Sequence, residues 1–218
     1  MLKVGVLLSG CGVNDGSEIH EAVLTMLALD RLGVERICIA PDIEQRDVVN
    51  HLSGAAAVET RNVLVESARI ARGEISALAT ISAADLDALI LPGGFGAAKN
   101  LSDFAVAGEL AEVQPEVLRL LSDMHKAGKP IGAICIAPAV VARALGGLNP
   151  LLTIGNDPAT ATVLEGFGAC HQDCPVDDIV VDETNLLVST PAYMLGPGLK
   201  EIASGIDKLV EKVVALAT

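Results

Sequence analysis

The fold of this chain is decided by the stretch KPIGAICIAP at residues 129–138. Its apolar run predicts a short buried strand that ends at Cys135 and turns at once into a helix over Ala139–Leu145. A parallel strand that breaks sharply into a helix holds its last side chain at the helix N-terminus, where backbone N–H groups and the helix dipole favour negative charge. We therefore expect the pKa of Cys135 to lie below the ordinary value of about 8.5, which leaves the thiol partly ionised and nucleophilic near neutral pH.

Composition favours one α/β domain built around such strands. The 218 residues suffice for one sizeable core and are few for two. Hydrophobic residues make up 51% and aromatic residues 2%, so the core must consist of Ala, Val, Leu and Ile, which suits parallel strands and closely packed helices. The net charge of -13, the absence of Trp and the single Tyr argue against a nucleic-acid partner.

Cysteine usage and hydropathy bear on location. Five cysteines without regular spacing do not resemble a secreted disulfide framework, so we expect a reducing compartment and a cytoplasmic location. The sequence LSGC at residues 8–11 resembles the end of a lipoprotein signal, but the preceding apolar run, Val4–Leu8, is shorter than the roughly 7–15 residues that such a signal needs. No run reaches the roughly 18 apolar residues of a membrane span, so we expect no membrane association.

Strands and helices alternate along the chain as in a doubly wound sheet. The N-terminal part predicts a buried strand at Lys3–Ser9, a Gly-rich loop, a helix over residues 18–32 capped by Ser17, and a strand at Glu35–Ala40. Further strands are expected at Asp85–Leu91 and Leu151–Ile154, a hairpin from Asp178–Val181 and Leu186–Ser189, and further helices at Pro115–Ala127, 157–166 and 198–217.

Residues 41–80 are polar and irregular by comparison. Helical spacing occurs within Asn62–Arg72, and a short apolar run at Ile75–Ile81 fits a strand. We interpret residues 41–80 as a family-specific insertion packed on the sheet, where it could form a wall of the site or a dimer contact. The whole chain, residues 1–218, is expected to be a single domain.

The candidate site lies where four predicted strands end, near residues 9, 91, 135 and 189. In open α/β sheets, ligands bind outside the carboxyl ends of the strands. The pair Gly93-Gly94 follows one of these strands and lets backbone N–H groups approach a developing oxyanion. The same segment resembles part of a dinucleotide fingerprint, but its third glycine and its acidic residue are absent, so that match is weak.

Glu21 is the candidate acid. Taken alone, it is most simply a surface glutamate in the second turn of the first helix. Its functional interpretation is a carboxyl that faces the crevice and is kept protonated by burial and by the neighbouring thiolate. Such a group could hydrogen-bond the sulfur of Cys135 and later move a proton.

The cluster CHQDCP at residues 170–175 could be read as a metal site. Its spacing is not the Cys-x2-Cys pair of a structural zinc site, and no second pair follows, so a packed loop is the simpler interpretation and we expect no metal. Cys11, on a neighbouring strand-end loop, could approach Cys135 as a resolving thiol. Cys38 falls inside a strand and is predicted to be a core residue.

Together these segments resemble the PfpI-like, class I glutamine amidotransferase-like superfamily, and most closely its ElbB branch of isoprenoid biosynthesis glyoxalases. The sequence LILPGG at residues 89–94 is similar to the family's oxyanion-side loop, and GAIC at 132–135 to its nucleophile elbow; Glu21 falls where the family's thiol-associated glutamate sits. The segments SGCGV at 9–13, DGSEIHEA at 15–22 and CPVDD at 174–178 resemble the ElbB branch in particular.

The resemblance implies a flavodoxin-like three-layer α/β/α sandwich with a mostly parallel sheet, a homodimer, and a Cys135–Glu21 site without a cofactor. Two departures from the family matter. Ile136 stands where many members carry a histidine, and STPAY at residues 189–193 replaces the His and Glu of true glutaminases. No base for Cys135 is therefore evident unless His171 or Asp157 folds into the site.

The leading hypothesis, which the resemblance implies, is a cofactor-independent glyoxalase that converts small 2-oxoaldehydes, glyoxal first, to 2-hydroxy acids. Cys135 would form a hemithioacetal whose oxygen meets Gly94 and the backbone N–H of Ile136, and Glu21 would move the proton between the two carbons. Two alternatives stay open: a non-catalytic redox sensor or accessory protein that uses the same cysteine, and a glutaminase-like amidotransferase subunit.

Overall fold

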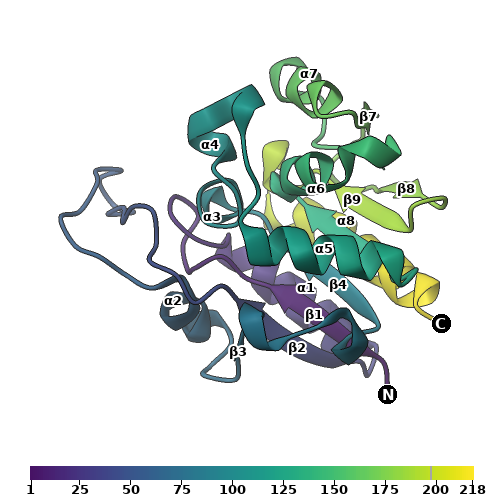
Figure 1. Cartoon of the computed structure of the whole chain (residues 1–218), viewed down its shortest axis with the longest axis horizontal. Coiled ribbons are helices and arrows are strands. Elements are labelled where there is room, and N and C mark those ends of the chain that lie inside the picture. The colour runs from purple at the N-terminus through teal and green to yellow at the C-terminus, as the bar shows by residue number, and fades with distance from the viewer. Residues whose placement is uncertain (197) are drawn as a thin grey trace.

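A seven-stranded sheet with helices on both faces forms the centre of the computed structural model, which describes residues 1–196 and 198–218 (Figure 1). The strand order is β3-β2-β1-β4-β5-β9-β8, and every neighbouring pair is parallel except β9 with β8. The strands are β1 Lys3–Leu7, β2 Glu35–Ala40, β3 Ser76–Ala77, β4 Ala88–Leu91, β5 Ile131–Ile134, β8 Val180–Asp182 and β9 Leu187–Thr190. The predicted flavodoxin-like α/β/α sandwich is confirmed.

Two apolar layers attach the helices to the sheet. Because successive strand residues point to opposite faces, Ala88 and Ile90 of β4 join one layer, and Leu89 and Leu91 join the other. The first layer packs against α1, α2 and α8, and the second against α3, α5 and α6. The helices are α1 Ile19–Arg31, α2 Val63–Ile70, α3 Phe95–Lys99, α4 Phe104–Ala107, α5 Pro115–Lys126, α6 Ala137–Leu145, α7 Pro158–Gly166 and α8 Leu199–Leu216.

The cap of α1 differs from the prediction. Glu18, not Ser17, caps the helix, because its side chain accepts a hydrogen bond from the backbone N–H of Glu21 at 2.7 Å. Ser17 is buried, and its hydroxyl accepts a hydrogen bond from the backbone N–H of Ser9 at 2.8 Å. The serine therefore ties the start of α1 to the end of β1 and leaves Glu18 next to the site.

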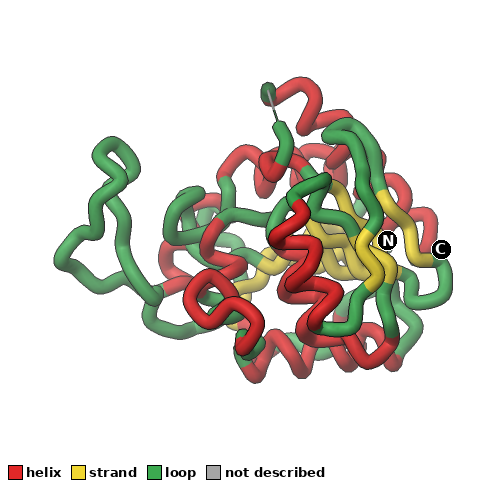
Figure 2. Tube along the Cα trace, turned by 90° about the horizontal axis from the view of Figure 1, so that it is seen from above, coloured by secondary structure: helices red, strands yellow, loops and turns green. Residues whose placement is uncertain are grey.

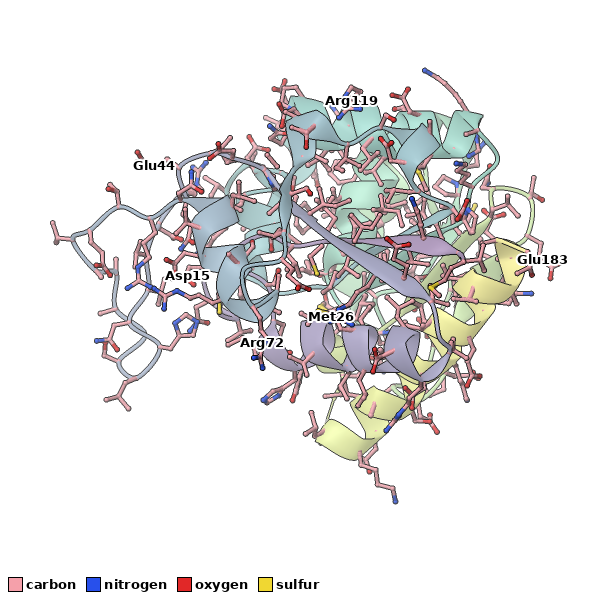
Figure 3. The ribbon with its side chains drawn as sticks, turned by 90° about the horizontal axis from the view of Figure 1, so that it is seen from below. Asp15, Met26, Glu44, Arg72, Arg119 and Glu183 are labelled. Atoms are coloured by element: carbon pink, nitrogen blue, oxygen red, sulfur yellow. The ribbon has the colours of Figure 1, made fainter. Side chains whose placement is uncertain are left out.

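The segment 41–80 divides into two parts. Residues 63–80 belong to the sandwich: α2 packs on the sheet, and β3 pairs with β2 at the sheet edge before a 3-10 turn at Leu78–Thr80. The predicted strand at Ile75–Ile81 is thus only two residues long. The loop before α2 projects from the body (Figures 1 and 2). One hydrogen bond ties this loop to the body: the backbone N–H of Val49 donates to Oδ2 of Asp15 at 2.7 Å (Asp15 in Figure 3).

The C-terminal half confirms the predicted hairpin and corrects one strand. Strands β8 and β9 are antiparallel neighbours at the sheet edge. The strand predicted at Leu151–Ile154 is the two-residue β6, Leu151–Leu152, which pairs with β7, Cys170–His171, in a separate small sheet. Its shortness is explained by Gly155, whose φ of 98° turns the chain away.

Helix α8 covers the sheet through one apolar stripe. Ile202, Ile206, Leu209, Val210 and Val213 are buried, whereas charged residues occupy the opposite side of the helix. Within the described residues, no helix, α8 included, is both long and apolar enough to cross a membrane. The helix therefore serves as the outer layer of the sandwich.

Truncating this stripe should destabilise the fold. We expect Leu209→Ala to lower the free energy of unfolding by about 2–5 kcal/mol, because the leucine is fully buried against Gly132 of β5. The matched control is Leu199→Ala in the same helix, where the side chain is 49% exposed and the loss should stay within about 0.5 kcal/mol. Urea unfolding measures both, and equal losses would contradict the packing described.

Candidate active site

Four neighbouring strands bring their carboxyl ends to one edge of the sheet. Strands β1, β4, β5 and β9 are adjacent in the sheet and parallel to one another. The loops that follow them carry Gly16–Glu18, Gly93-Gly94, Cys135 and Tyr193. The predicted convergence of these strand ends is confirmed, and this edge contains the candidate site.

Cys135 occupies a sharp elbow between β5 and α6. Its φ of 62° lies in the left-handed region, which is rare for residues other than glycine and is typical of strained functional positions. Its backbone N–H donates to the carbonyl of Thr190 at 3.0 Å, which holds the elbow against β9. The backbone N–H groups of Gly94 and Ile136 act to lower the pKa of the thiol. The predicted sharp turn from strand to helix is present at Cys135, whereas the oxyanion role of Gly94 and Ile136 stays a prediction.

Glu21 is fully buried beside this sulfur. Its carboxyl lies beside the Cys135 side chain and accepts hydrogen bonds from the backbone N–H of Gly93 at 2.9 Å and of Tyr193 at 3.3 Å. Gly93 is required here, because a Cβ on it would lie 2.5 Å from the Cβ of Cys135 and 2.7 Å from Oε2 of Glu21. The expectation that Gly93 binds substrate is corrected: its N–H is used by Glu21.

The ionisation of the pair differs in part from the sequence-based expectation. Burial, followed by the neighbouring Glu18, raises the pKa of Glu21 to about 8, so this carboxyl holds its proton at neutral pH as predicted. Burial and the Glu21 carboxyl also raise the pKa of the Cys135 thiol well above its usual range. The prediction of a lowered thiol pKa is therefore wrong, because the two backbone N–H donors do not offset the loss of water around the sulfur.

A cavity of about 450 Å³ opens over the thiol. Cys135, Gly94 and Ile136 lie in its wall, and Thr160 of α7 adds a hydroxyl. The lining residues are Val13, Glu18, Gly94, Phe95, Ala98, Phe104, Ala105, Cys135, Ile136, Thr160, Tyr193 and Met194. The cavity is mainly apolar and places its nucleophile at the wall, which is the usual arrangement of a small-molecule site.

A second polar group at the cavity was missed by the sequence analysis. The Tyr193 hydroxyl lies 2.7 Å from Nδ1 of His20, and the same nitrogen lies 3.9 Å from Oε1 of Glu18. His20 points away from Glu21 along α1, but the turn after β9 brings Tyr193 to it from the far end of the chain. The single tyrosine of an aromatic-poor sequence was the available signal for this contact.

Three predicted accessory residues lie outside the cavity lining. The Nε2 atom of His171 lies 3.4 Å from the backbone N–H of Ile154, in the small second sheet. Asp157 caps α7 by accepting from Thr160, and that hydrogen bond lowers the pKa of Asp157. Cys11 is half-buried, and burial raises its pKa. The expectation that one of them folds in as a base or resolving thiol is not supported, because each is held elsewhere.

The cluster at residues 170–175 does not assemble as a ligand set in the structure. Cys170 is exposed, whereas Cys174 is buried. The described residues contain no group of three or more His, Cys, Asp or Glu side chains placed to hold a metal ion. The packed-loop interpretation fits this arrangement.

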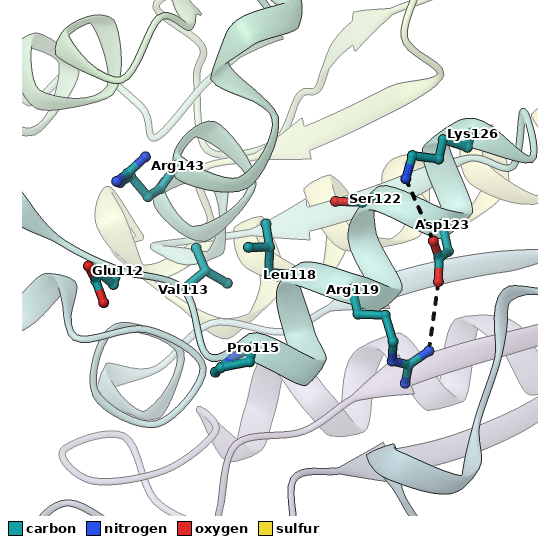
Figure 4. Close-up of a pocket in the computed structure, with 9 residues that line it drawn as sticks. All are labelled: Glu112, Val113, Pro115, Leu118, Arg119, Ser122, Asp123, Lys126 and Arg143. Carbon is teal, nitrogen blue, oxygen red and sulfur yellow. Dashed lines mark ion pairs between the residues drawn. The ribbon is translucent and has the colours of Figure 1, made fainter.

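A larger open pocket of about 620 Å³ lies along α5, away from the thiol (Figure 4). Its charged side chains pair with one another: Asp123 lies 3.9 Å from Arg119 and 4.0 Å from Lys126. No cysteine or histidine lines it among the described residues. Although this pocket is larger, the cavity at Cys135 is the better candidate active site because it contains the thiol and the adjacent carboxyl.

The fold and the pair Cys135–Glu21 together define a class, a flavodoxin-like protein with a nucleophile elbow. Comparison with known families is specific: the model of the DJ-1/PfpI family matches residues 11–191. The chain belongs to the DJ-1/PfpI family.

Individual relatives agree with this membership. Glutamine amidotransferase-like class 1 domain-containing protein 3, mitochondrial, of Homo sapiens is 47% identical and aligns over 98% of this chain and 83% of its own length. The ES1 protein, mitochondrial, of Danio rerio is 35% identical over 98% of this chain and 86% of its own length. The crystal structure of an isoprenoid biosynthesis protein with amidotransferase-like domain from Ehrlichia chaffeensis superimposes with a TM-score of 0.93 and 40% identity over 100% of both chains.

These relatives bear on the resemblance and on location. The Ehrlichia structure confirms the likeness to the isoprenoid biosynthesis branch that the sequence motifs indicated. Both vertebrate relatives carry the word mitochondrial in their names. The expected cytoplasmic location of this chain and its expected homodimer stay predictions.

The raised pKa of Glu21 makes stability depend on pH. An unfolded glutamate ionises near pH 4.3, whereas the folded one ionises near 8, so between these values the folded chain keeps a proton that the unfolded chain releases. The folded state is therefore destabilised as pH rises from about 4.3 to about 8, by an amount on the order of 4 kcal/mol.

We expect Glu21→Gln to remove this dependence. The unfolding free energy of the parent should fall relative to that of the variant as pH rises from 4.5 to 8, as measured by urea denaturation at several pH values. Glu211→Gln, on the exposed side of α8, is the matched control and should follow the parent. Parallel curves for the parent and Glu21→Gln would contradict the buried, protonated carboxyl.

Proposed function

We propose that the protein is a cofactor-independent glyoxalase that converts 2-oxoaldehydes to 2-hydroxy acids. One observation carries the proposal: the Cys135 thiol lies at the wall of a cavity beside the buried Glu21 carboxyl, and the backbone N–H groups of Gly94 and Ile136 adjoin it. A nucleophile, a proton carrier and oxyanion donors are the groups that this isomerisation requires. Membership of the DJ-1/PfpI family is consistent with it.

The first step is addition of the thiol to the aldehyde. The sulfur of Cys135 bonds to the aldehyde carbon, the ionised fraction of Glu21 takes the thiol proton, and the aldehyde oxygen becomes an alkoxide. The N–H groups of Gly94 and Ile136, which adjoin the sulfur, stabilise this oxygen. Glu21 then returns the proton to the oxygen, which completes a neutral hemithioacetal.

The second step moves hydrogen from one carbon to the other. Glu21 removes the hydrogen on the former aldehyde carbon as a proton, which leaves an enediolate, and returns that proton to the neighbouring carbon. The hydroxyl proton passes from the first oxygen to the second, so the hemithioacetal becomes the isomeric thioester of a 2-hydroxy acid. One water molecule hydrolyses the thioester and frees the thiol. The sum is one 2-oxoaldehyde plus one water giving one 2-hydroxy acid, without any external oxidant or reductant.

The protonation of Cys135 and Glu21 predicts slow turnover. Both the thiol and the carboxyl hold their protons at neutral pH, so only a minority of molecules carry the base form of Glu21. No histidine lines the described cavity to replace it. The site is therefore organised for the reaction, but only a small fraction of the molecules has Glu21 in the ionised form that starts it.

Replacing the nucleophile tests the proposal directly. We expect Cys135→Ser to lower glyoxal consumption and glycolate formation by at least about a hundredfold, because a hydroxyl is a far weaker nucleophile here. Cys170→Ser, which removes an exposed thiol outside the cavity, should keep full activity. Undiminished glycolate formation by Cys135→Ser would refute the mechanism.

Activity should rise with pH. Because Glu21 has a pKa of about 8 and acts as the base, kcat/KM for glyoxal should increase through pH 6–8 and change less above that range. The base-catalysed background is measured with Cys135→Ser and subtracted at each pH. A profile that is flat from pH 6 to 9.5 would exclude Glu21 as the base.

The redox-sensor alternative makes a contrasting prediction. Thiol oxidation by peroxide follows thiolate character and access, and the Cys135 thiol is 7% exposed with a raised pKa. We expect mild peroxide to leave Cys135 largely reduced while exposed Cys170 reacts, as followed by mass spectrometry. Stoichiometric oxidation of Cys135 without aldehyde turnover would favour the sensor, and ammonia release from glutamine would favour the amidotransferase.

A further inference from the structure

Three of the four Phe and Tyr side chains of the protein lie at the candidate active site, and the fourth packs against one of them. The sequence contains three Phe, one Tyr and no Trp. Phe95, Phe104 and Tyr193 line the cavity over Cys135. The remaining ring, Phe167, packs edge-to-face against Phe104 with the ring centroids 6.2 Å apart. Phe104 and Phe167 are partly buried against one apolar layer of the sandwich and Tyr193 against the other, but no aromatic ring is among the fully buried core residues described.

Phe95 is the clearest member of this group. Its side chain is 51% exposed at the start of α3. Packing in the core therefore does not explain why a large apolar ring occupies this position. The ammonium of Lys99, which is also paired with Asp47 at 2.8 Å, lies 5.6 Å from the ring centroid. The ring lies in the cavity wall and is accessible to an entering molecule.

The cavity is much larger than the smallest 2-oxoaldehyde. Its volume of about 450 Å³ compares with about 30 Å³ for one water molecule in the liquid, and glyoxal has only four non-hydrogen atoms. Bound at Cys135, glyoxal would leave most of the apolar lining in contact with water. A substrate with an apolar substituent would cover Phe95, Phe104 and Met194 and gain the corresponding hydrophobic free energy.

The charge of the cavity lining disfavours substrates with an anionic substituent. Glu18 is the one ionisable carboxyl among the cavity residues described, and neither Lys nor Arg lines the cavity with it. A carboxylate or phosphate on the substrate would meet this carboxyl without a cation to pair with. The lining therefore disfavours anionic substituents.

We propose that the preferred substrates are uncharged 2-oxoaldehydes with an aryl or branched alkyl substituent, held between Phe95 and Phe104 while Cys135 adds to the aldehyde carbon. This inference rests on the proposed function and names its substrate class. For phenylglyoxal, one molecule plus one water gives mandelate, by the same addition, hydrogen transfer and hydrolysis. No arginine lines the described cavity, so the reaction of phenylglyoxal with guanidinium groups occurs elsewhere.

Turnover gives the first test. We expect kcat/KM for phenylglyoxal to exceed that for glyoxal by at least about tenfold, since a buried apolar group is worth this much in a fitted pocket. Ala105→Phe, which narrows the cavity from the exposed helix α4, should reduce this ratio at least about fivefold. Val106→Phe is the matched control, because Val106 is the exposed neighbour that does not line the cavity, and it should keep the parent ratio.

Binding gives a second test that does not require turnover. Phenylacetaldehyde should protect Cys135 from alkylation by iodoacetamide at a concentration at least about tenfold lower than acetaldehyde, and Phe95→Ala should weaken that difference. Protection with this preference but no hydroxy-acid formation would leave the substrate class standing and refute the glyoxalase. Turnover of glyoxal and phenylglyoxal at equal efficiency, or equal protection by the two monoaldehydes, would refute the substrate class.

Discussion

The site depends on one crowded contact, the place where Glu21, Gly93 and Cys135 meet. The Glu21 carboxyl is fully buried, accepts a hydrogen bond from the N–H of Gly93 at 2.9 Å and lies beside the Cys135 side chain. The absence of a side chain at Gly93 allows β4 and β5 to end this close to α1. The contact joins three elements that are distant in sequence, and the elbow, the oxyanion donors and the cavity wall are arranged around it.

Burial fixes the chemistry of that contact as well as its geometry. Removing water raises the pKa values of both partners, so the carboxyl is a proton donor at rest and the thiol is protected from ionisation. The left-handed backbone of Cys135 holds the sulfur at the cavity in spite of this. The site is thus organised before substrate arrives, while its reactive form is scarce, which suits a selective reaction better than a fast one.

Different residue types form the core and the cavity lining. Mainly Leu, Ile, Val and Ala fill both layers of the sandwich, whereas three aromatic rings line the cavity and Phe167 packs against one of them. Tyr193 contributes to both ends of the arrangement: its backbone N–H supports Glu21, and its hydroxyl lies 2.7 Å from His20. The turn after β9 therefore supports the site directly, although it is distant in sequence from Glu21 and His20.

The sequence by itself determined the α/β class and the elbow at Cys135, because strand–helix alternation and local motifs are properties of short segments. The pairing of Cys135 with the distant Glu21 was predicted with the help of the family resemblance. The sequence could not determine the thiol pKa, since desolvation depends on every atom packed around the sulfur, nor the use of the Gly93 N–H. The pairing of His20 with Tyr193 and the gathering of the aromatic rings were likewise decided by the tertiary structure alone. These contacts join residues up to 173 positions apart, and no local pattern records such distances.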